Sequence, residues 1–73
     1  MIEIKIGQLW ADNDPRSKGR VLRIVHIKEP YIAAVVVRDR IDARVSRIGR
    51  ITRIHRNRMK PTKSGYRLIE ANE

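Results

Sequence analysis

The chain has no cysteine, no phenylalanine and few aromatic residues of any kind, and these absences limit its architecture. Without cysteine there is neither a disulfide framework nor a thiolate metal site, which are common supports of domains as short as 73 residues. Aromatic residues make up 4% of the chain, so Val and Ile are expected to form the interior. The hydrophobic fraction of 41% is too high for a disordered basic tail, and the length suits one small domain over residues 1–73.

Long apolar runs are missing as well. The longest one, residues 31–37, is far shorter than the roughly 20 residues that a membrane-spanning helix needs. The first residues, Met1–Lys5, do not combine a basic region with an uninterrupted apolar stretch, so a secretory signal is not expected. We therefore expect a protein of the reducing cytoplasm that has no membrane contact.

Acidic residues are scarce, and their distribution is uneven. The chain has 17 Lys and Arg against 8 Asp and Glu, a formal net charge of +9. The segment from Arg38 to Lys63 alone carries +8, because its only acids are Asp39 and Asp42, and residues 44–63 contain no acid. Arg outnumbers Lys by 12 to 5, and the guanidinium group suits bidentate contacts with phosphate. This segment predicts a surface that binds a polyanion, with nucleic acid the first choice.

Strand signals dominate the remaining pattern. Runs rich in β-branched residues predict strands at about residues 8–10, 20–28, 31–38, 49–55 and 66–69, separated by turn signals at 11–15, 29–30 and 61–65. Within residues 20–28, strict alternation places Leu22 and Ile24 on one face and Val21, Val25 and Ile27 on the other. Five short strands in so short a chain predict a mainly β fold, a small closed or half-closed barrel.

The segment 40–48 permits two interpretations. Ile41, Val45 and Ile48 have helical spacing, with Asp39 as an N-cap and Gly49 as a stop signal. Arginines at every third position from residue 44 to residue 56, however, would spiral around one helix and would alternate faces on one strand. We therefore expect either a short helix or a long hairpin excursion at about 40–48, followed by a strand.

A frame of residues resembles known small proteins. It consists of Gly7-Gln-Leu-Trp-Ala-Asp-Asn-Asp-Pro-Arg16, Gly19-Arg20, Gly49-Arg-Ile-Thr-Arg-Ile54, Pro61 and Gly65-Tyr-Arg-Leu68. The frame resembles a family of small proteins of actinobacteria and their phages, and more loosely the KOW-type and SH3-like small barrels. That resemblance implies a five-stranded SH3-like barrel over the single domain, and it transfers no activity. KOW-type barrels often bind RNA, ribosomes or polymerase, which adds weight to nucleic acid as the partner.

The basic residues are the main candidate site. A non-enzymatic protein that binds DNA or RNA mainly through the phosphate backbone needs several aligned cations, and its affinity then depends steeply on salt. The candidate binding residues are Arg44, Arg47, Arg50, Arg53, Arg56, Arg58 and Lys60, flanked by Arg16, Lys18 and Arg20.

Two aromatic residues and one acidic tripeptide are further candidate motifs. Tyr31 and Trp10 are candidate stacking platforms for unpaired bases, although a lone Trp is more often a core residue. Asp12-Asn13-Asp14 lacks the remaining ligands of a calcium loop, so we expect an Asx-type turn whose carboxylates hold Arg16, Lys18 or Arg20. No nucleophile, base and phosphate-loop pattern is present, so no catalytic residue, cofactor or metal is expected.

A second function class uses the same charge. An interaction module, for example a phage-encoded one, that docks on an acidic host protein is steered by the same electrostatic field. The apolar residues Ile41, Val45 and Ile48 discriminate between the two classes. Exposed on a helix they favour a protein partner or a homodimer, whereas burial of them with only the arginines in solvent favours nucleic acid.

Overall fold

The computed structural model describes residues 3–41 and 44–70 and contains one five-stranded antiparallel sheet. The strands are β1 (Leu9–Asp12), β2 (Val21–Lys28), β3 (Tyr31–Arg38), β4 (Ile51–His55) and β5 (Tyr66–Glu70). Their spatial order is β4-β3-β2-β1-β5. The predicted mainly β fold is confirmed, and each predicted strand is present with ends that move by at most two residues.

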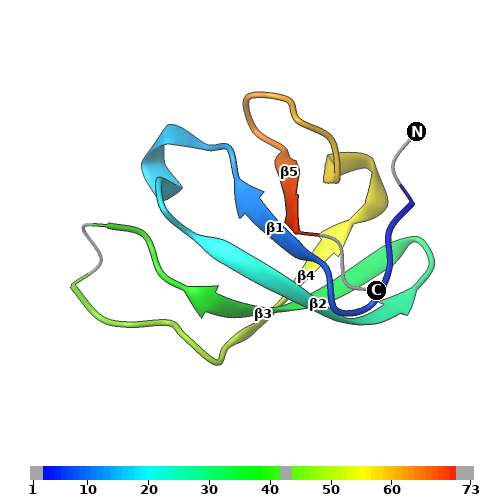
Figure 1. Cartoon of the computed structure of the whole chain (residues 1–73), viewed down its shortest axis with the longest axis horizontal. Helices are drawn as coiled ribbons and strands as arrows, with labels where there is room; N and C mark the ends of the chain where they lie inside the picture. The colour runs from blue at the N-terminus through cyan, green and yellow to red at the C-terminus, as the bar shows by residue number, and fades with distance from the viewer. Residues whose placement is uncertain (1–2, 42–43, 71–73) are drawn as a thin grey trace.

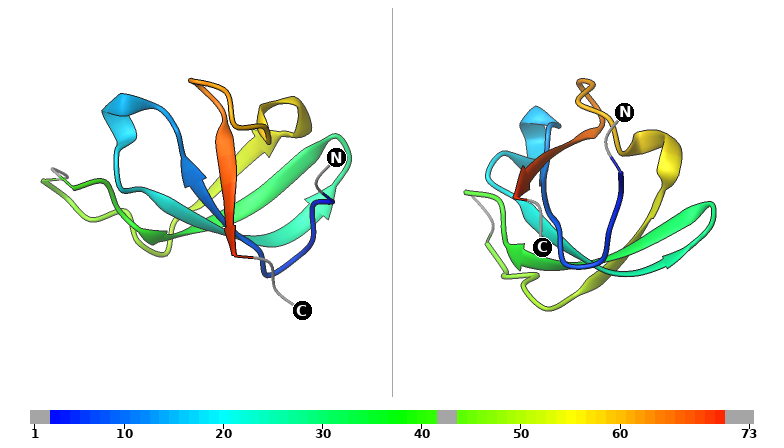
Figure 2. Two further views of the ribbon diagram at one scale, coloured as in Figure 1. Left: turned by 45° about the horizontal axis from the view of Figure 1, so that its top comes forward. Right: turned by 45° about the vertical axis from the view of Figure 1, so that its right-hand side comes forward.

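The sheet is curled but not closed. The sheet is strongly bent (Figure 1), and the right-hand view of Figure 2 shows its edge strands β5 and β4 on opposite sides of the bend. Within the described residues no ladder joins β4 to β5, so the sheet keeps two edges. The result is an open, barrel-like sheet rather than a closed barrel.

A β-bulge in β2 determines which side chains point outward. Ile24 pairs with Ala34, but the next pair is His26 with Ala33, so Val25 is an extra residue on β2. The expected alternation is therefore wrong beyond Ile24. After the bulge Ile27 points to the core side, and His26 and Lys28 lie on the exposed outer face of the sheet.

The core lies on the concave side of the sheet. Its buried residues are Ile4, Trp10, Leu22, Ile24, Ile32, Ala34, Val36, Ile54, Met59 and Tyr66, with Ile27 and Leu68 packed against them. Aliphatic side chains form most of this core, as the absence of phenylalanine predicts. The side chain of Gln8 is buried too, and its Oε1 accepts hydrogen bonds from the Lys5 backbone N–H and from Trp10 Nε1.

The segment between β3 and β4 is a hairpin excursion. Its described residues, 39–41 and 44–50, contain no helix, so the hairpin alternative holds for this part, while residues 42–43 lie outside the described residues. The helical elements of the described chain are two single 3₁₀ turns, η1 (Pro15–Ser17) and η2 (Arg56–Arg58). No helix within the described ranges has the length and apolarity needed to cross a membrane.

Candidate nucleic-acid interface

The loop between β3 and β4 is organised by one carboxylate. Asp39 Oδ1 accepts a hydrogen bond of 2.8 Å from the backbone N–H of Arg40, and Asp39 Oδ2 accepts one of 2.6 Å from that of Arg47. These backbone donors, that of Arg47 above all, lower the pKa of Asp39 from its ordinary 3.8. The base of the loop is closed by the Gly49 N–H, which donates to the Val36 carbonyl at 2.8 Å.

The first loop of the chain contacts this excursion. The backbone N–H of Ile41 donates to the Lys18 carbonyl at 2.9 Å. Gly19 has a φ of +95°, and a Cβ built on it would lie 2.8 Å from Ile41 Cγ1 and 3.3 Å from the Ile41 nitrogen. Only glycine fits this backbone conformation and this close approach without strain. Lys18 is thereby held beside the arginine-rich loop.

Four cations form what we call the loop cluster: Lys18, Arg44, Arg47 and Arg50. All four are exposed. Among the described residues none of them has a carboxylate within ion-pair distance. Asp39, the one acid described in this loop, uses both carboxylate oxygens on backbone N–H groups. The loop cluster therefore presents charge to solvent that its own scaffold does not pair.

Three other predicted binding residues are ion-paired. Arg16 contacts Asp14 through Nε (3.2 Å) and Nη2 (3.0 Å), and this contact lowers the pKa of Asp14 to about 2. Arg20 Nη1 lies 3.4 Å from Asp12 Oδ2, and Asp12 is 8% exposed. The expected Asx-type turn is confirmed, because Asp12 also accepts from the Asp14 backbone N–H. These arginines are partly neutralised and belong to the scaffold of the first loop.

The third ion pair joins the turn between β2 and β3 to η2. Arg56 makes a bidentate contact with Glu29, with Nε 2.6 Å from Oε1 and Nη2 against Oε2. The contact lowers the pKa of Glu29 and raises that of Arg56. Sequence separation hides this pair, because the partners are 27 residues apart.

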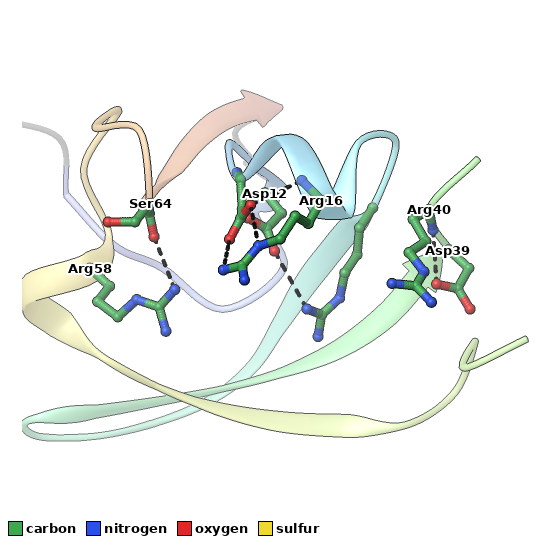
Figure 3. Close-up of polar contacts among 8 residues, drawn as sticks. Asp12, Arg16, Asp39, Arg40, Arg58 and Ser64 are labelled. Atoms are coloured by element: carbon green, nitrogen blue, oxygen red, sulfur yellow. Dashed lines mark hydrogen bonds and ion pairs between the residues drawn. The ribbon is translucent and has the colours of Figure 1, made fainter. Parts of the chain in front are cut away.

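The remaining predicted cations near η2 lie at another end of the molecule. Arg58 Nη2 donates to the Ser64 carbonyl at 2.9 Å, and its guanidinium lies 5.5 Å from the centre of the Tyr66 ring. Lys60 is exposed, and its carbonyl accepts from the Tyr66 backbone N–H. Figure 3 shows the Arg58–Ser64, Arg16 and Asp39–Arg40 contacts on three separate loops. The predicted residues therefore do not form one continuous site.

The two candidate stacking residues have different environments. Trp10 is 1% exposed in the core, so stacking by Trp10 is a wrong prediction and the core interpretation is right. Tyr31 is 39% exposed at the start of β3. The Arg53 guanidinium lies 4.5 Å from the centre of its ring, and the His55 ring meets it edge-on at 5.4 Å between centroids. Arg53 therefore belongs with Tyr31 on the outer face of the sheet and not with the loop cluster.

Sequence reasoning missed the neighbours of this aromatic residue. A hollow of about 450 Å³ lies beside Tyr31 and Arg53, and its lining also includes His26, Lys28 and Ala33. The bulge at Val25 brings His26 and Lys28 to this face, and no local sequence signal marks the bulge.

The apolar residues of the excursion are in solvent. Ile41 is 78% exposed, Val45 76% and Ile48 59%. They do not lie on a helix in the described residues, so neither of the two discriminating arrangements is realised.

No comparison with known proteins identifies the chain: no family model, no curated protein and no solved structure matches it. Within the described residues there is also no group of three or more His, Cys, Asp or Glu placed to hold a metal ion.

Proposed function

We propose that this protein is a non-enzymatic, cytoplasmic nucleic-acid-binding domain that contacts the phosphate backbone of DNA or RNA through the loop cluster. The observation that carries the proposal is the unpaired state of Lys18, Arg44, Arg47 and Arg50 in the described structure. Arg16, Arg20 and Arg56 are paired with acids, whereas the loop cluster holds four exposed cations that have no described carboxylate partner and that a polyanion can approach.

The scaffold supports this function. The order β4-β3-β2-β1-β5, with a 3₁₀ turn before the last strand, is compatible with an SH3-like barrel, the fold that the resemblance implies. The Asp39 contacts and the Lys18–Ile41 bond restrict the loop before any ligand arrives. A restricted loop loses less conformational entropy on binding than a free one.

The test is fluorescence anisotropy with labelled duplex DNA, single strands and RNA over a salt series. Four phosphate contacts predict a slope of about −3 to −4 in a plot of log affinity against log salt for duplex DNA. Absence of binding to any of the three at low salt would overturn the proposal. Binding that does not change with salt would exclude the phosphate mechanism.

A second function is favoured by the exposed Ile41, Val45 and Ile48. Together with the arginines they suit a partner protein, for example a host protein of a phage, that has an acidic surface with apolar residues. Pull-down from a cell lysate with and without nuclease separates the two functions. Partners that are lost on nuclease treatment support nucleic acid, whereas a protein that is retained supports the interaction module.

A further inference from the structure

We infer that the hollow beside Tyr31 is a binding site for an unpaired base, so that the nucleic acid bound by this domain is single-stranded. This inference rests on the proposed function, because it assigns the class of nucleic acid and adds a second contact region. The observations that carry it lie on the outer face of β2, β3 and β4, away from the loop cluster.

The hollow lies on the outer face of three strands. Ala33 pairs across the sheet with His26 on β2 and with Arg53 on β4. Tyr31 lies two residues earlier on the same face of β3. These residues line an open space of about 450 Å³, within the usual range of about 300–1,000 Å³ for small-ligand sites, and the small side chain of Ala33 adds to its depth.

The chemistry of the lining suits a base attached to phosphate. The Arg53 guanidinium lies over the Tyr31 ring, both residues line the hollow, and both kinds of plane stack on nucleic-acid bases. Lys28 supplies a cation at the rim. Glu29 is the one acid in the lining, and its carboxylate is bound by Arg56, so it leaves little unbalanced negative charge toward a phosphate.

The position of the hollow favours a single strand over a duplex. A base in a duplex presents only its edges, whereas an unpaired base exposes its flat face for stacking. Tyr31, which lines the hollow, begins β3, and the excursion that carries Arg44, Arg47 and Arg50 follows the other end of this strand (Figure 1). The seven residue steps of β3 span about 23 Å. A flexible single strand of about 12 nucleotides is long enough to place a base at Tyr31 and phosphates at the loop.

The experiment compares three ligands of about 12 nucleotides: a thymidine strand, an abasic strand with the same phosphates, and a duplex. The DNA and RNA versions of the single strand are measured in parallel. We expect the wild-type protein to bind the base-containing strand about 5- to 100-fold more tightly than the abasic strand. Tyr31→Ala and Ala33→Ile should both abolish that preference, the first by removing the ring and the second by placing a branched side chain beside Tyr31 and Arg53, where it obstructs the base. The variant Tyr31→Phe, which keeps an aromatic face, should retain the preference for the base-containing strand.

The outcomes separate the two proposals. Equal binding of the base-containing and abasic strands by the wild-type protein overturns the base site and leaves phosphate binding by the loop cluster intact. A preference that survives both Tyr31→Ala and Ala33→Ile also overturns the site. Absence of binding to any nucleic acid at low salt overturns the proposed function itself. Thermal unfolding followed by the fluorescence of the buried Trp10 verifies that each variant is folded.

Discussion

The carboxylate of Asp39 lies 2.6 Å from the backbone nitrogen of Arg47, eight residues further along the chain. The contact crosses the whole excursion between β3 and β4, and the other carboxylate oxygen binds the Arg40 N–H. An acid in a basic segment would normally pair with a guanidinium, but this one binds backbone N–H groups with both of its oxygens. Asp39 therefore shapes the loop that carries the arginines of the loop cluster.

Asp39→Asn should loosen the loop. An amide has only one acceptor oxygen, so one of the two backbone contacts is lost. We expect the amide hydrogen of Arg47 or Arg40 to exchange several-fold faster, while the amides of β2 and β3 keep their rates. The measurement is hydrogen exchange followed by NMR. Unchanged rates at both loop amides would show that the carboxylate does not hold the loop in solution.

The same contact predicts a dependence on pH. The folded-state pKa of Asp39 is below 3.8, so its contribution to stability is present above that pH and is lost as the pH falls through the lowered value. The contribution of Asp14 to stability is likewise lost as the pH falls, because its pKa is lowered to about 2, mainly by the hydrogen bond from the Arg16 side chain. Titration of the carboxyl carbons by NMR should give a midpoint near 2 for Asp14 and one below 3.8 for Asp39. A midpoint at or above 3.8 would contradict the ion pair or the loop contacts.

Neutralising the loop cluster should reduce the salt dependence of binding. Arg44→Gln together with Arg47→Gln removes two proposed phosphate contacts, which lowers the steepness of the salt slope for duplex DNA by about 1.8. The matched control is Arg16→Gln together with Arg20→Gln, which changes the net charge equally but removes arginines paired with acids. Equal slopes for the two double variants would show that binding follows total charge and not this loop.

Two glycines with nearly the same positive φ, Gly19 and Gly49, provide a test of the contact between the first loop and the excursion. Gly49 has a φ of +92° with nothing within 4 Å of a Cβ, whereas Gly19 would place its Cβ against Ile41. Gly49→Ala should cost about 1–2 kcal/mol from backbone strain alone. Gly19→Ala should cost more, because Ile41 must also move. Urea denaturation followed by Trp10 fluorescence compares them, and equal losses would show that the contact with Ile41 contributes nothing.

The aliphatic core leaves little reserve of stability. Leu22 is fully buried, and Leu22→Ala should cost about 2–5 kcal/mol, comparable to the total stability of about 3–5 kcal/mol expected for a domain of this size. We expect that variant to be largely unfolded at room temperature by circular dichroism. Ile69→Ala, at a position that is 51% exposed, is the control and should remain folded. A fully folded Leu22→Ala variant would indicate a larger reserve.

Much of the fold could be predicted because its signals are local. β-branched runs and Gly, Pro and Asp turns marked all five strands within two residues. The bulge at Val25 was not predictable, since an inserted residue is defined only by the register with β3. The choice between helix and hairpin for residues 40–48 also depended on contacts between distant residues, because the Asp39 carboxylate accepts from the Arg47 N–H and the Ile41 N–H donates to the Lys18 carbonyl.

The candidate site was predictable only in part. The sequence located the basic segment, but it did not show which arginines meet an acid. Arg56 forms an ion pair with Glu29, which is far from it in the sequence. Arg44, Arg47 and Arg50, in contrast, have no described carboxylate partner. The hollow could not be predicted because its lining residues His26, Ala33 and Arg53 lie on three different strands, which only the register of the sheet brings together.

The open edge of the sheet at β4 has a consequence for self-association. An unpaired strand edge is a template for pairing with a second copy, and Ile51 on this edge is 68% exposed. Arg50 and Arg53 stand on either side of Ile51, so two such edges repel each other in dilute salt. High ionic strength shortens the range of that repulsion to about 3 Å at 1 M. These arginines therefore oppose edge-to-edge association at low salt, and their effect weakens as the salt concentration rises.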